Sequence, residues 1–412
     1  MYIKQSPNPN KLSNFLAFFR QRQSGLILAI AVIAVITVFT INGLSGDSVI
    51  NDNPHSMAQL TDNNKAANNN IAISLPSSRP FIDGVDKRIH NELSSYVTWL
   101  QDNEATAVIG EFGWPNSNGL DGDKWDLIAS QWLKDIEQTG IPTYYWASGT
   151  GWGEYPLAAH TASNGRITGG NSQDRILQDN RGANEGINVA GLEFGTQLSG
   201  FSNVSNEMVD TQYINNSTSV YADLARSGYR QIRLPFSWER IQPDLFGELD
   251  PVYFGYVRDA VQQAARNDQT MLLDLHNYGR YITLTGDSLL GSEELPHASL
   301  ADVWKRISKG LNDIPTEVVE YGIMNEPHDL LSGSWGSSEK NWEAASQTVV
   351  KTLRSTGDKR KIVIAGYNWS KLSTWSQYHP SSWIQDPLNN FSYEAHHYWD
   401  HDTSGRYEGR YR

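Results

Sequence analysis

Cysteine is absent from the 412-residue sequence, so disulfide bonds cannot hold the fold together. Runs of basic residues long enough to follow a phosphate backbone are also missing, and the formal net charge is −13 at pH 7. The missing basic runs and the negative net charge argue against nucleic acid as a partner. The length allows one large domain or two or three small ones. No internal repeat is evident, and we expect a monomer.

One uninterrupted apolar run stands out, Gly25–Ile41, preceded by a polar segment whose charges are lysines and arginines. Its length is at the lower edge for a membrane-spanning helix and beyond the usual signal-peptide core. No clear Ala-x-Ala cleavage site follows it. We therefore expect a cytoplasmic tail at 1–24 and an uncleaved signal anchor at 25–41. A cleaved signal peptide is the alternative, and both interpretations export the rest of the chain.

Residues 42–80 are rich in Asn, Asp and Ser and have few large apolar side chains. This composition predicts a disordered linker, because the segment cannot form a core.

From Phe81 the pattern changes to alternating strands and helices. Between the strands, apolar residues recur at helical spacing, as in 89–100, 125–136, 300–311 and 342–353. The alternation predicts a (β/α)₈ barrel over 81–412. Within it, residues 158–186 interrupt the rhythm, and we expect a loop there without any element longer than about one turn. The strands are expected at 106–114, 142–146, 187–194, 231–236, 270–275, 318–324, 361–365 and 391–397.

Polar residues gather where these strands end, which is where βα-barrels carry their chemistry. Glu326 follows one strand and Glu111 ends another. Hydrolysis of an acetal needs two carboxyl groups, one protonated and one ionised. It also needs donors that orient the nucleophile, and an aromatic floor for the sugar. The other candidates are Arg233, His276, Asn277, Asn325, His396, Tyr398, Trp146 and, in the Trp- and Gly-rich loop after it, Trp152.

Several of these residues have structural alternatives. Arg233 can be an ion-pair partner within the barrel, and His276 a core histidine. Glu193, near another strand end, fits a structural role or a distant sugar contact better than a catalytic one. Residues 394–402 could be read as a metal cluster, but the adjacent His396 and His397 point to opposite faces of a strand and make poor joint ligands. We expect no metal and no cofactor.

Seven stretches together resemble glycoside hydrolase family 5, the endoglucanase family, and most closely its secreted endo-β-1,4-glucanases. They are Ile-Asn-Val-Ala-Gly-Leu-Glu-Phe-Gly, Arg-Leu-Pro-Phe-Ser-Trp-Glu-Arg, Leu-Asp-Leu-His-Asn-Tyr-Gly-Arg-Tyr, Met-Asn-Glu-Pro-His-Asp, Tyr-Glu-Ala-His-His-Tyr-Trp-Asp, Gly-Glu-Phe-Gly and Tyr-Tyr-Trp-Ala-Ser-Gly. The resemblance implies that Glu326 is the acid/base and Glu111 the nucleophile. It implies a supporting shell of Arg233, His276, Asn325, His396 and Tyr398, with Trp146 as the aromatic platform.

The order of the motifs departs from the family. There, the Gly-Glu-Phe-Gly and Tyr-Tyr-Trp strands come last, whereas here they precede the strand that should open the barrel. This resembles a circular permutation, with 158–186 joining the old ends and crossing the outside of the barrel without entering the core. We therefore expect the strand ending at His397 beside the strand ending at Glu111, and Arg412 near Phe81.

The resemblance implies a retaining endo-β-1,4-glucanase, acting on β-glucan polysaccharide and held outside the membrane by the anchor. A β-mannanase, a xyloglucanase or a mixed-linkage glucanase would use the same machinery. A catalytically inactive sugar-binding barrel is the alternative of another class, and the presence of both Glu326 and Glu111 argues against it.

Overall fold

The computed structural model describes Leu75 and Gly182, residues 79–116, 121–180, 185–196, 209–283 and 286–409, and Tyr411. The tail expected at 1–24 and the anchor expected at 25–41 lie outside these residues. Among the residues described, no helix is both long enough and apolar enough to cross a membrane.

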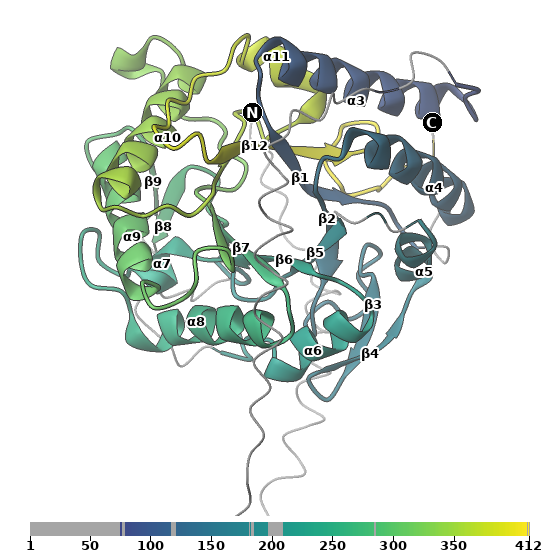
Figure 1. Ribbon diagram of the computed structural model, residues 1–412, viewed down its shortest axis with the longest axis horizontal. Helices are drawn as coiled ribbons and strands as arrows, with labels where there is room; N and C mark the ends of the chain where they lie inside the picture. The colour runs from purple at the N-terminus through teal and green to yellow at the C-terminus, as the bar shows by residue number, and fades with distance from the viewer. Residues whose placement is uncertain are drawn as a thin grey trace, which may run out of the picture. The chain divides into compact units, whose positions relative to one another are not determined.

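Eight parallel strands form a closed barrel in the order β1-β12-β11-β10-β7-β6-β5-β2. Figure 1 shows the barrel with its helices around it. The predicted barrel and the existence of its eight strands are therefore confirmed, but β5 ends at Val189 instead of residue 194 and β10 at Gly322 instead of residue 324. Strand bounds are β1 (Ala107–Gly113), β2 (Thr143–Ser148), β5 (Glu185–Val189), β6 (Gln231–Phe236), β7 (Thr270–Leu275), β10 (Val319–Gly322), β11 (Ile362–Ala365) and β12 (Phe391–Tyr398).

Helices between successive strands form the outer layer (Figure 1). Asp83 and Asp250 begin two of them, each accepting hydrogen bonds from two backbone N–H groups of the first turn. α3 precedes β1 and packs against α4 on one side and α11 on the other. The helices are α3 (Gly84–Asp102), α4 (Gly122–Thr139), α5 (Ser172–Asp179), α6 (Thr218–Arg226), α8 (Pro251–Arg266), α9 (His297–Gly310), α10 (Ser338–Ser355) and the short α11 (Trp375–Tyr378).

Shorter elements lie in the loops. A hairpin of β8 (Arg280–Thr283) and β9 (Gly286–Leu289) follows β7, and α7 (Trp238–Ile241) follows β6. Two short 3₁₀ helices, η2 (Gly333–Trp335) and η3 (Leu372–Thr374), precede α10 and α11.

The prediction for 158–186 was wrong in two respects. The segment forms an antiparallel hairpin, β3 (His160–Ser163) with β4 (Arg166–Gly170), and then the two-turn helix α5. Ile176 and Leu177 of α5 are buried in the main core, so the segment does enter it. Sequence periodicity missed this helix because a short helix stabilised by packing on α4 needs few apolar residues.

The predicted linker also ends earlier than residue 80. Arg79 lies between α3 and α4, where its guanidinium nitrogen is 2.6 Å from a carboxylate oxygen of Asp86 and 2.7 Å from one of Asp135. Leu75 packs against the core. A polar composition did not reveal this, because ion pairing rather than apolar burial fixes Arg79.

β1 and β12 pair in parallel, as expected from the sequence. The register runs regularly to Ile109, skips Gly110, and resumes with Glu111 opposite His396. The extra residue is a β-bulge, which shifts the alternation of side chains by one. Near the end of the chain, the Tyr411 hydroxyl donates a 2.6 Å hydrogen bond to Asp83, so this part of the chain does lie near Phe81; Arg412 itself is outside the described residues.

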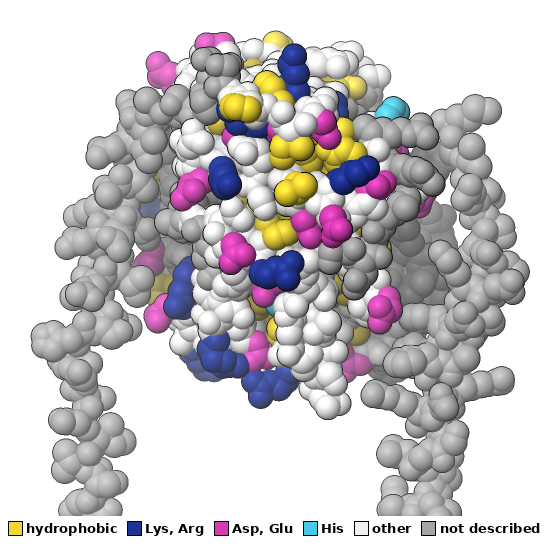
Figure 2. All heavy atoms as spheres, turned by 90° about the vertical axis from the view of Figure 1, so that its right-hand side faces the viewer, with side chains coloured by type: hydrophobic (Ala, Val, Ile, Leu, Met, Phe, Trp, Pro, Cys, Tyr) yellow, Lys and Arg dark blue, Asp and Glu magenta, His cyan; other side chains and the backbone are white. Residues whose placement is uncertain are grey.

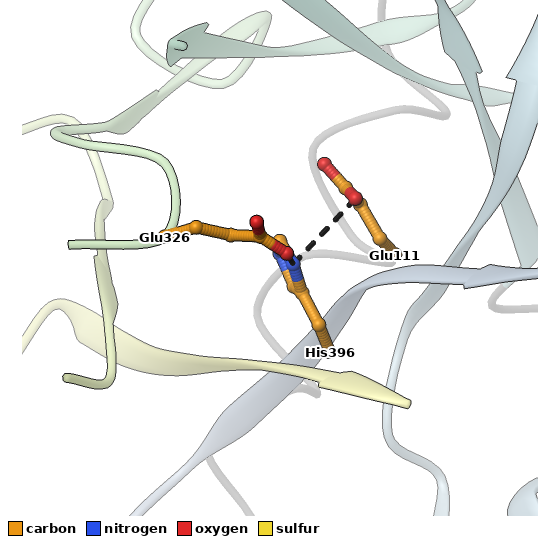
Figure 3. Close-up of side chains that lie close together, drawn as sticks. All are labelled: Glu111, Glu326 and His396. Atoms are coloured by element: carbon orange, nitrogen blue, oxygen red, sulfur yellow. Dashed lines mark hydrogen bonds and ion pairs between the residues drawn. The ribbon is translucent and has the colours of Figure 1, made fainter. Parts of the chain in front are cut away.

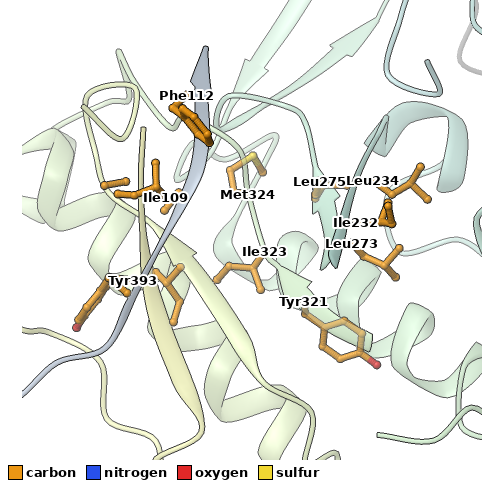
Figure 4. Packing of buried hydrophobic residues seen from close by; sticks show 14 of the residues in the cluster. Ile109, Phe112, Ile232, Leu234, Leu273, Leu275, Tyr321, Ile323, Met324 and Tyr393 are labelled. Carbon is orange, nitrogen blue, oxygen red and sulfur yellow. The ribbon is translucent and has the colours of Figure 1, made fainter. Parts of the chain in front are cut away.

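Two layers of apolar side chains flank the sheet. Those facing the helices belong to one large core, part of which Figure 4 shows around Phe112, Met324 and Tyr393. A small separate cluster of Val108, Tyr144, Leu272 and Val363 occupies part of the inside of the barrel. On the face that Figure 2 shows, acidic and basic side chains of the described residues are interspersed.

Trp132 on α4 provides a test of this packing. Its ring centroid lies 4.6 Å from that of Phe112 and 5.4 Å from that of Trp399, and its indole N–H donates to His397. We expect Trp132→Ala to lower the free energy of unfolding by about 3–5 kcal/mol, since a large buried side chain leaves a cavity. Urea denaturation measures the change. Leu127→Ala on the same helix is the control, because Leu127 is 60% exposed; equal losses in the two variants would contradict the assignment.

Candidate active site

Two carboxylates and one imidazole meet at the carboxyl ends of the strands (Figure 3). Glu111 comes from β1, His396 from β12, and Glu326 from the loop after β10. In the barrel order β12 is the neighbour of β1 and β11 separates it from β10, so His396 lies between the two carboxylates. The structure therefore brings together the two carboxyls on which the sequence hypothesis depended and one residue of the predicted supporting shell, His396.

The bulge at Gly110 explains how Glu111 reaches the interior. Val108 faces the inside of the barrel and Ile109 the helices. Regular alternation would then turn Glu111 outward and Phe112 inward. The extra residue reverses this, so that Glu111 enters the site while Phe112 packs against the helices.

Glu111 is held at both oxygens. Nη1 of Arg233 lies 2.8 Å from Oε1, and the hydroxyl of Tyr398 donates a 2.9 Å hydrogen bond to Oε2. Burial, and then the charge of Glu111, raise the pKa of Tyr398 well above its ordinary value, so the phenol remains a donor. A cation and a hydroxyl donor together stabilise a negative charge on Glu111.

Glu326 is more open, with 16% of its side chain exposed, and Oε1 lies 2.7 Å from Nδ1 of His396. Its backbone φ is 43°, a left-handed conformation that is uncommon outside glycine. The strand itself ends at Gly322, so Glu326 stands on a short turn rather than directly at the strand end.

His396 is surrounded by carboxylates. Its Nδ1 is 2.7 Å from Glu326 and 3.6 Å from Glu111, and its Nε2 is 3.0 Å from Glu394. Burial alone would lower the pKa of His396. The charge of Glu111 and the hydrogen bonds to Glu326 and Glu394 outweigh burial and raise that pKa to about 10. The ring therefore carries protons through the neutral range.

Arg233 is the cation at the centre of the barrel, and its side chain is fully buried. Burial alone would lower its pKa, but the surrounding carboxylates raise it further above its usual value. The sequence left a structural ion pair as the alternative for Arg233, and the geometry shows that it pairs with site and interior carboxylates alike. Its terminal nitrogens lie 2.7 to 3.1 Å from side-chain oxygens of Glu111, Asn188, Asn325, Asp274 and Glu394.

His276 and the tryptophans form the adjoining wall. Nδ1 of His276 is 2.7 Å from Asp274, and its Nε2 is 3.3 Å from the amide nitrogen of Asn325. The rings of Trp146 and His276 stack at 5.4 Å. The ring of Trp152 lies edge-on to that of Trp146, with 5.8 Å between the ring centroids, so Trp152 packs against the predicted aromatic platform.

Asn277 is not brought into this group. Its amide nitrogen donates a 2.6 Å hydrogen bond to Glu239, and its oxygen accepts one from the backbone N–H of Trp238. These contacts fix the α7 loop against the β7 end. Because neighbouring residues point to different sides, His276 enters the site and Asn277 leaves it.

Two further expectations concern Glu193 and His397. Oε2 of Glu193 accepts a hydrogen bond from the backbone N–H of Gly191, and burial raises the pKa of Glu193 to about 7. His397 faces away from the site, 3.0 Å from Glu92 of α3. The prediction that the two adjacent histidines point to opposite faces is confirmed.

The sequence analysis missed Asp274, Glu394 and Asn188, which are fully buried inside the barrel. A signal for two of them was present. Asp274 and Glu394 each precede a site histidine by two residues on a strand, and residues at that spacing share a face. Trp369, half-buried after β11 and stacked on His328 at 4.1 Å, is a second aromatic surface that was missed.

A metal ion does not fit the site well. Among the described residues, one group of three could hold an ion, namely Glu111, Glu326 and His396. The Arg233 guanidinium is bonded to Glu111, and His396 retains its protons in the neutral range. A second cation there would meet a fixed positive charge and a protonated ligand.

A family model described as cellulase (glycosyl hydrolase family 5) matches residues 187–411, more than half of the chain. The chain belongs to glycosyl hydrolase family 5. The match begins in β5, so β1 and β2 with Glu111 and Trp146 precede the matched part of this family 5 protein.

Several known proteins resemble the chain. The manganese dependent endoglucanase Eg5A of Phanerodontia chrysosporium is 25% identical over 53% of this chain and 54% of its own length. Endoglucanase 1 of a Robillarda species is 28% identical over 54% of this chain and 62% of its own length. This family 5 chain thus spans less than two thirds of these curated relatives. The crystal structure of an endo-beta-1,4-glucanase from Xanthomonas axonopodis pv. citri is 31% identical, covering 55% of this chain and 67% of that one, with a TM-score of 0.46.

The buried charges make a prediction for Arg233→Met. Removing the cation leaves Asp274 and Glu394 buried without it, and a broken buried pair costs about 3–5 kcal/mol. Burial already raises the pKa of Asp274 despite Arg233, and in the variant both carboxyls would take up protons more readily when folded than when unfolded. The stability of the variant relative to the parent should therefore improve as pH falls.

Thermal unfolding of both proteins between about pH 5 and pH 8 measures this difference. Arg230→Met is the matched control, since Arg230 is exposed and its Nη1 bonds a backbone carbonyl. An Arg233→Met deficit that stays constant across the pH range would contradict the reading.

Proposed function

We propose that this chain is a retaining endo-β-1,4-glucanase, which cleaves internal bonds of cellulose-like β-glucans by double displacement. The observation that carries the proposal is the spacing of the two carboxyls. One oxygen atom of Glu111 and one of Glu326 lie within 4.8 Å of each other, an approach that fits the closer of the two separations known for the carboxyl groups of glycosidases. Retaining glycosidases place their carboxyls about 5–5.5 Å apart, whereas inverting enzymes leave about 6.5–9.5 Å for a water molecule. The family, and the endoglucanases among its relatives, support the choice of substrate.

In the first step Glu111 attacks the anomeric carbon as a carboxylate. The bond from that carbon to the leaving oxygen breaks while Glu326 gives its proton to the oxygen. Arg233 and Tyr398 orient Glu111 and balance its charge before the attack. The product of this step is a glycosyl ester of Glu111 and a shortened glucan.

In the second step a water molecule replaces the departed sugar. Glu326, now a carboxylate, takes a proton from the water as its oxygen bonds to the anomeric carbon. The ester bond to Glu111 breaks and both carboxyls return to their starting states. Trp146, stacked on His276 beside the carboxyls, supplies an aromatic face for the sugar ring.

The first prediction concerns the two carboxyls. Glu111 must be ionised and Glu326 protonated in the active form, so the pH dependence of kcat/KM should be bell-shaped. Glu111→Ala and Glu326→Ala should each lose at least about 10²–10⁴-fold in rate on a glucan with a sugar leaving group. Glu320→Ala is the control, because the Glu320 side chain is half-exposed. Glu239 at the α7 loop is buried and would be a poor control. Near-normal activity of Glu326→Ala would remove Glu326 from the acid role.

The second prediction concerns stereochemistry and substrate. Proton NMR during hydrolysis of a soluble cello-oligosaccharide should show the β-anomer first, because two inversions restore the configuration. An initial α-anomer would exclude Glu111 as the nucleophile. In parallel, reducing-sugar release from carboxymethylcellulose should exceed that from mannan, xyloglucan and mixed-linkage glucan. Preference for one of those polymers would move the assignment within the family, and binding without hydrolysis would indicate an inactive sugar-binding barrel.

We also propose that the barrel is circularly permuted relative to the family order. The family match starts at β5 and runs to the C-terminal residues, while β1 and β2 complete the barrel between β12 and β5. Tyr411 bonds Asp83, so joining the termini of this domain needs only a short linker. A chain linked from 412 to 81 and opened between α5 and β5 should fold and act on the same substrate. Loss of folding would count against the permutation.

For localisation, we propose that residues 25–41 anchor the enzyme with its barrel on the extracytoplasmic side, or that they are removed to release it. The apolar run and the basic residues before it support export. Alkaline extraction of membranes separates the two outcomes, and full-length protein in the cytoplasm would contradict both.

A further inference from the structure

Glu394 has no role in the double displacement described above, yet it is completely buried beneath the site. It lies on β12, two residues before His396, and its Oε1 is 3.0 Å from Nε2 of His396 and 2.8 Å from Nη2 of Arg233. Burial would raise the pKa of Glu394, but the charge of Arg233 and the hydrogen bond to His396 lower it. The group is therefore a buried carboxylate.

The neighbouring strand is shaped around this carboxylate. A Cβ atom at position 110 would lie 1.9 Å from Oε1 of Glu394, so only glycine fits opposite it. Gly110 is also the bulge residue that turns Glu111 into the site. Its carbonyl accepts a 3.0 Å hydrogen bond from Asn188, which in turn accepts one from Arg233.

The second oxygen of Glu394, Oε2, is buried without a hydrogen-bond partner among the described residues. An unpaired buried oxygen of this kind costs stability, and each such case calls for a reason. Charge balance for Arg233 is an insufficient reason, because Asp274 and Glu111 already lie 3.1 and 2.8 Å from the same guanidinium. The remaining contact of Glu394 is the one with His396.

That contact determines which protons the imidazole carries. An ionised carboxylate only accepts, so Nε2 of His396 must be the N–H donor to Glu394. Nδ1 then faces Glu326 at 2.7 Å, and the raised pKa of His396 puts the proton between them on Nδ1 in the resting pair, from which it can pass to the Glu326 carboxyl. Without a carboxylate at Nε2, a neutral imidazole could carry its one proton on Nδ1. That N–H would donate to Glu326 and keep Glu326 permanently as a carboxylate.

We propose that Glu394 is a positioning residue for the acid/base step, holding the Nε2–H of His396 so that Nδ1 and Glu326 share the proton that the reaction uses. The inference rests on the proposed function. In the first step the shared proton leaves from Glu326 to the glycosidic oxygen; in the second a water proton restores it. The Nε2–H is neither consumed nor released, so the proton balance of the reaction is unchanged.

The charged and titratable groups around this pair come from several elements. Glu111 on β1 and Tyr398 on β12 lie on the nucleophile side. Arg233 on β6 and the Asp274–His276 pair at β7 lie beneath and beside it. Two buried tyrosines, Tyr96 and Tyr144, are near enough for Glu394 to raise the pKa of each, after burial as the main cause. None of these groups touches Nε2 of His396 in the described contacts.

Glu394→Gln tests the proposal with an isosteric change. The amide can donate to Nε2 and so favours the opposite tautomer. We expect kcat/KM on cellotetraose, whose leaving group needs a proton, to fall about 10–100-fold, the loss seen when the hydrogen-bond partner that orients a metal-binding histidine is removed. On 2,4-dinitrophenyl cellobioside, whose leaving group needs no proton, it should change little. Loss of the negative charge should also move the alkaline limb of the cellotetraose profile about 1–3 pH units lower.

Asp274→Asn is the matched control. It removes another carboxylate from Arg233 but contacts His276 instead of His396. Here we expect both substrates to be affected to the same degree and the alkaline limb to stay in place. Equal losses on both substrates in Glu394→Gln would overturn the proposal and leave Glu394 as a charge partner of Arg233. Absence of activity in the parent protein on both substrates would instead refute the proposed function.

A measurement on the unreacted protein keeps the proposal testable in every case. In protein labelled with ¹⁵N-histidine, the His396 signal, assigned with His396→Asn, should show a protonated Nε2 throughout the active pH range. Glu394→Gln should lower the pH at which the ring loses its second proton. A parent protein whose His396 is protonated at Nδ1 alone would contradict the proposal, whatever the activities.

Discussion

The guanidinium of Arg233 inside the barrel determines how the polar side chains around it are arranged. Arg233 is fully buried, and a buried cation is tolerated only when it is paired and hydrogen-bonded. Strands on both sides of β6 supply the partners: Asn188 from β5, Asp274 from β7, and Glu111 and Glu394 from the far side of the barrel. The nucleophile candidate, Glu111, is thus one of several carboxylates paired with a common cation. It is therefore in position before a substrate binds.

This arrangement separates the two carboxyls by environment. Glu111 is held by Arg233 and Tyr398 at its two oxygens, whereas Glu326 is partly exposed and contacts the imidazole of His396. A retaining mechanism needs one carboxyl ionised and the other protonated, and the two groups here differ in exposure and in hydrogen-bond partners. The neighbouring strand order β1-β12-β11-β10 brings the pair together although 326 − 111 = 215 positions separate them in the sequence.

The sequence predicted the barrel well because short apolar strands alternate with amphipathic helices. It also located Glu111, Glu326, His276 and His396 near the carboxyl ends of strands, whereas Arg233 lies within β6 and was found as a lone cation in an apolar strand. The interior charges Asp274 and Glu394 were missed because each is a single acidic residue in an otherwise apolar strand, and its position two residues before a site histidine was the one signal. α5 and Arg79 were missed because the sequence around them is polar and gives no apolar pattern. Tertiary contacts with α4 stabilise both, and these contacts cannot be predicted from local sequence.

Gly110 shows how closely the fold and the chemistry are joined on β1. A regular strand would turn both Glu111 and Phe112 to the wrong side, because a shift of one residue reverses the faces. The bulge satisfies both, giving Phe112 to the helix-facing core and Glu111 to the site. The same residue must lack a side chain because Glu394 occupies the space beside it, and its freed carbonyl is bound by Asn188. One backbone irregularity therefore aims the nucleophile candidate, accommodates the carboxylate behind His396, and connects both to Arg233.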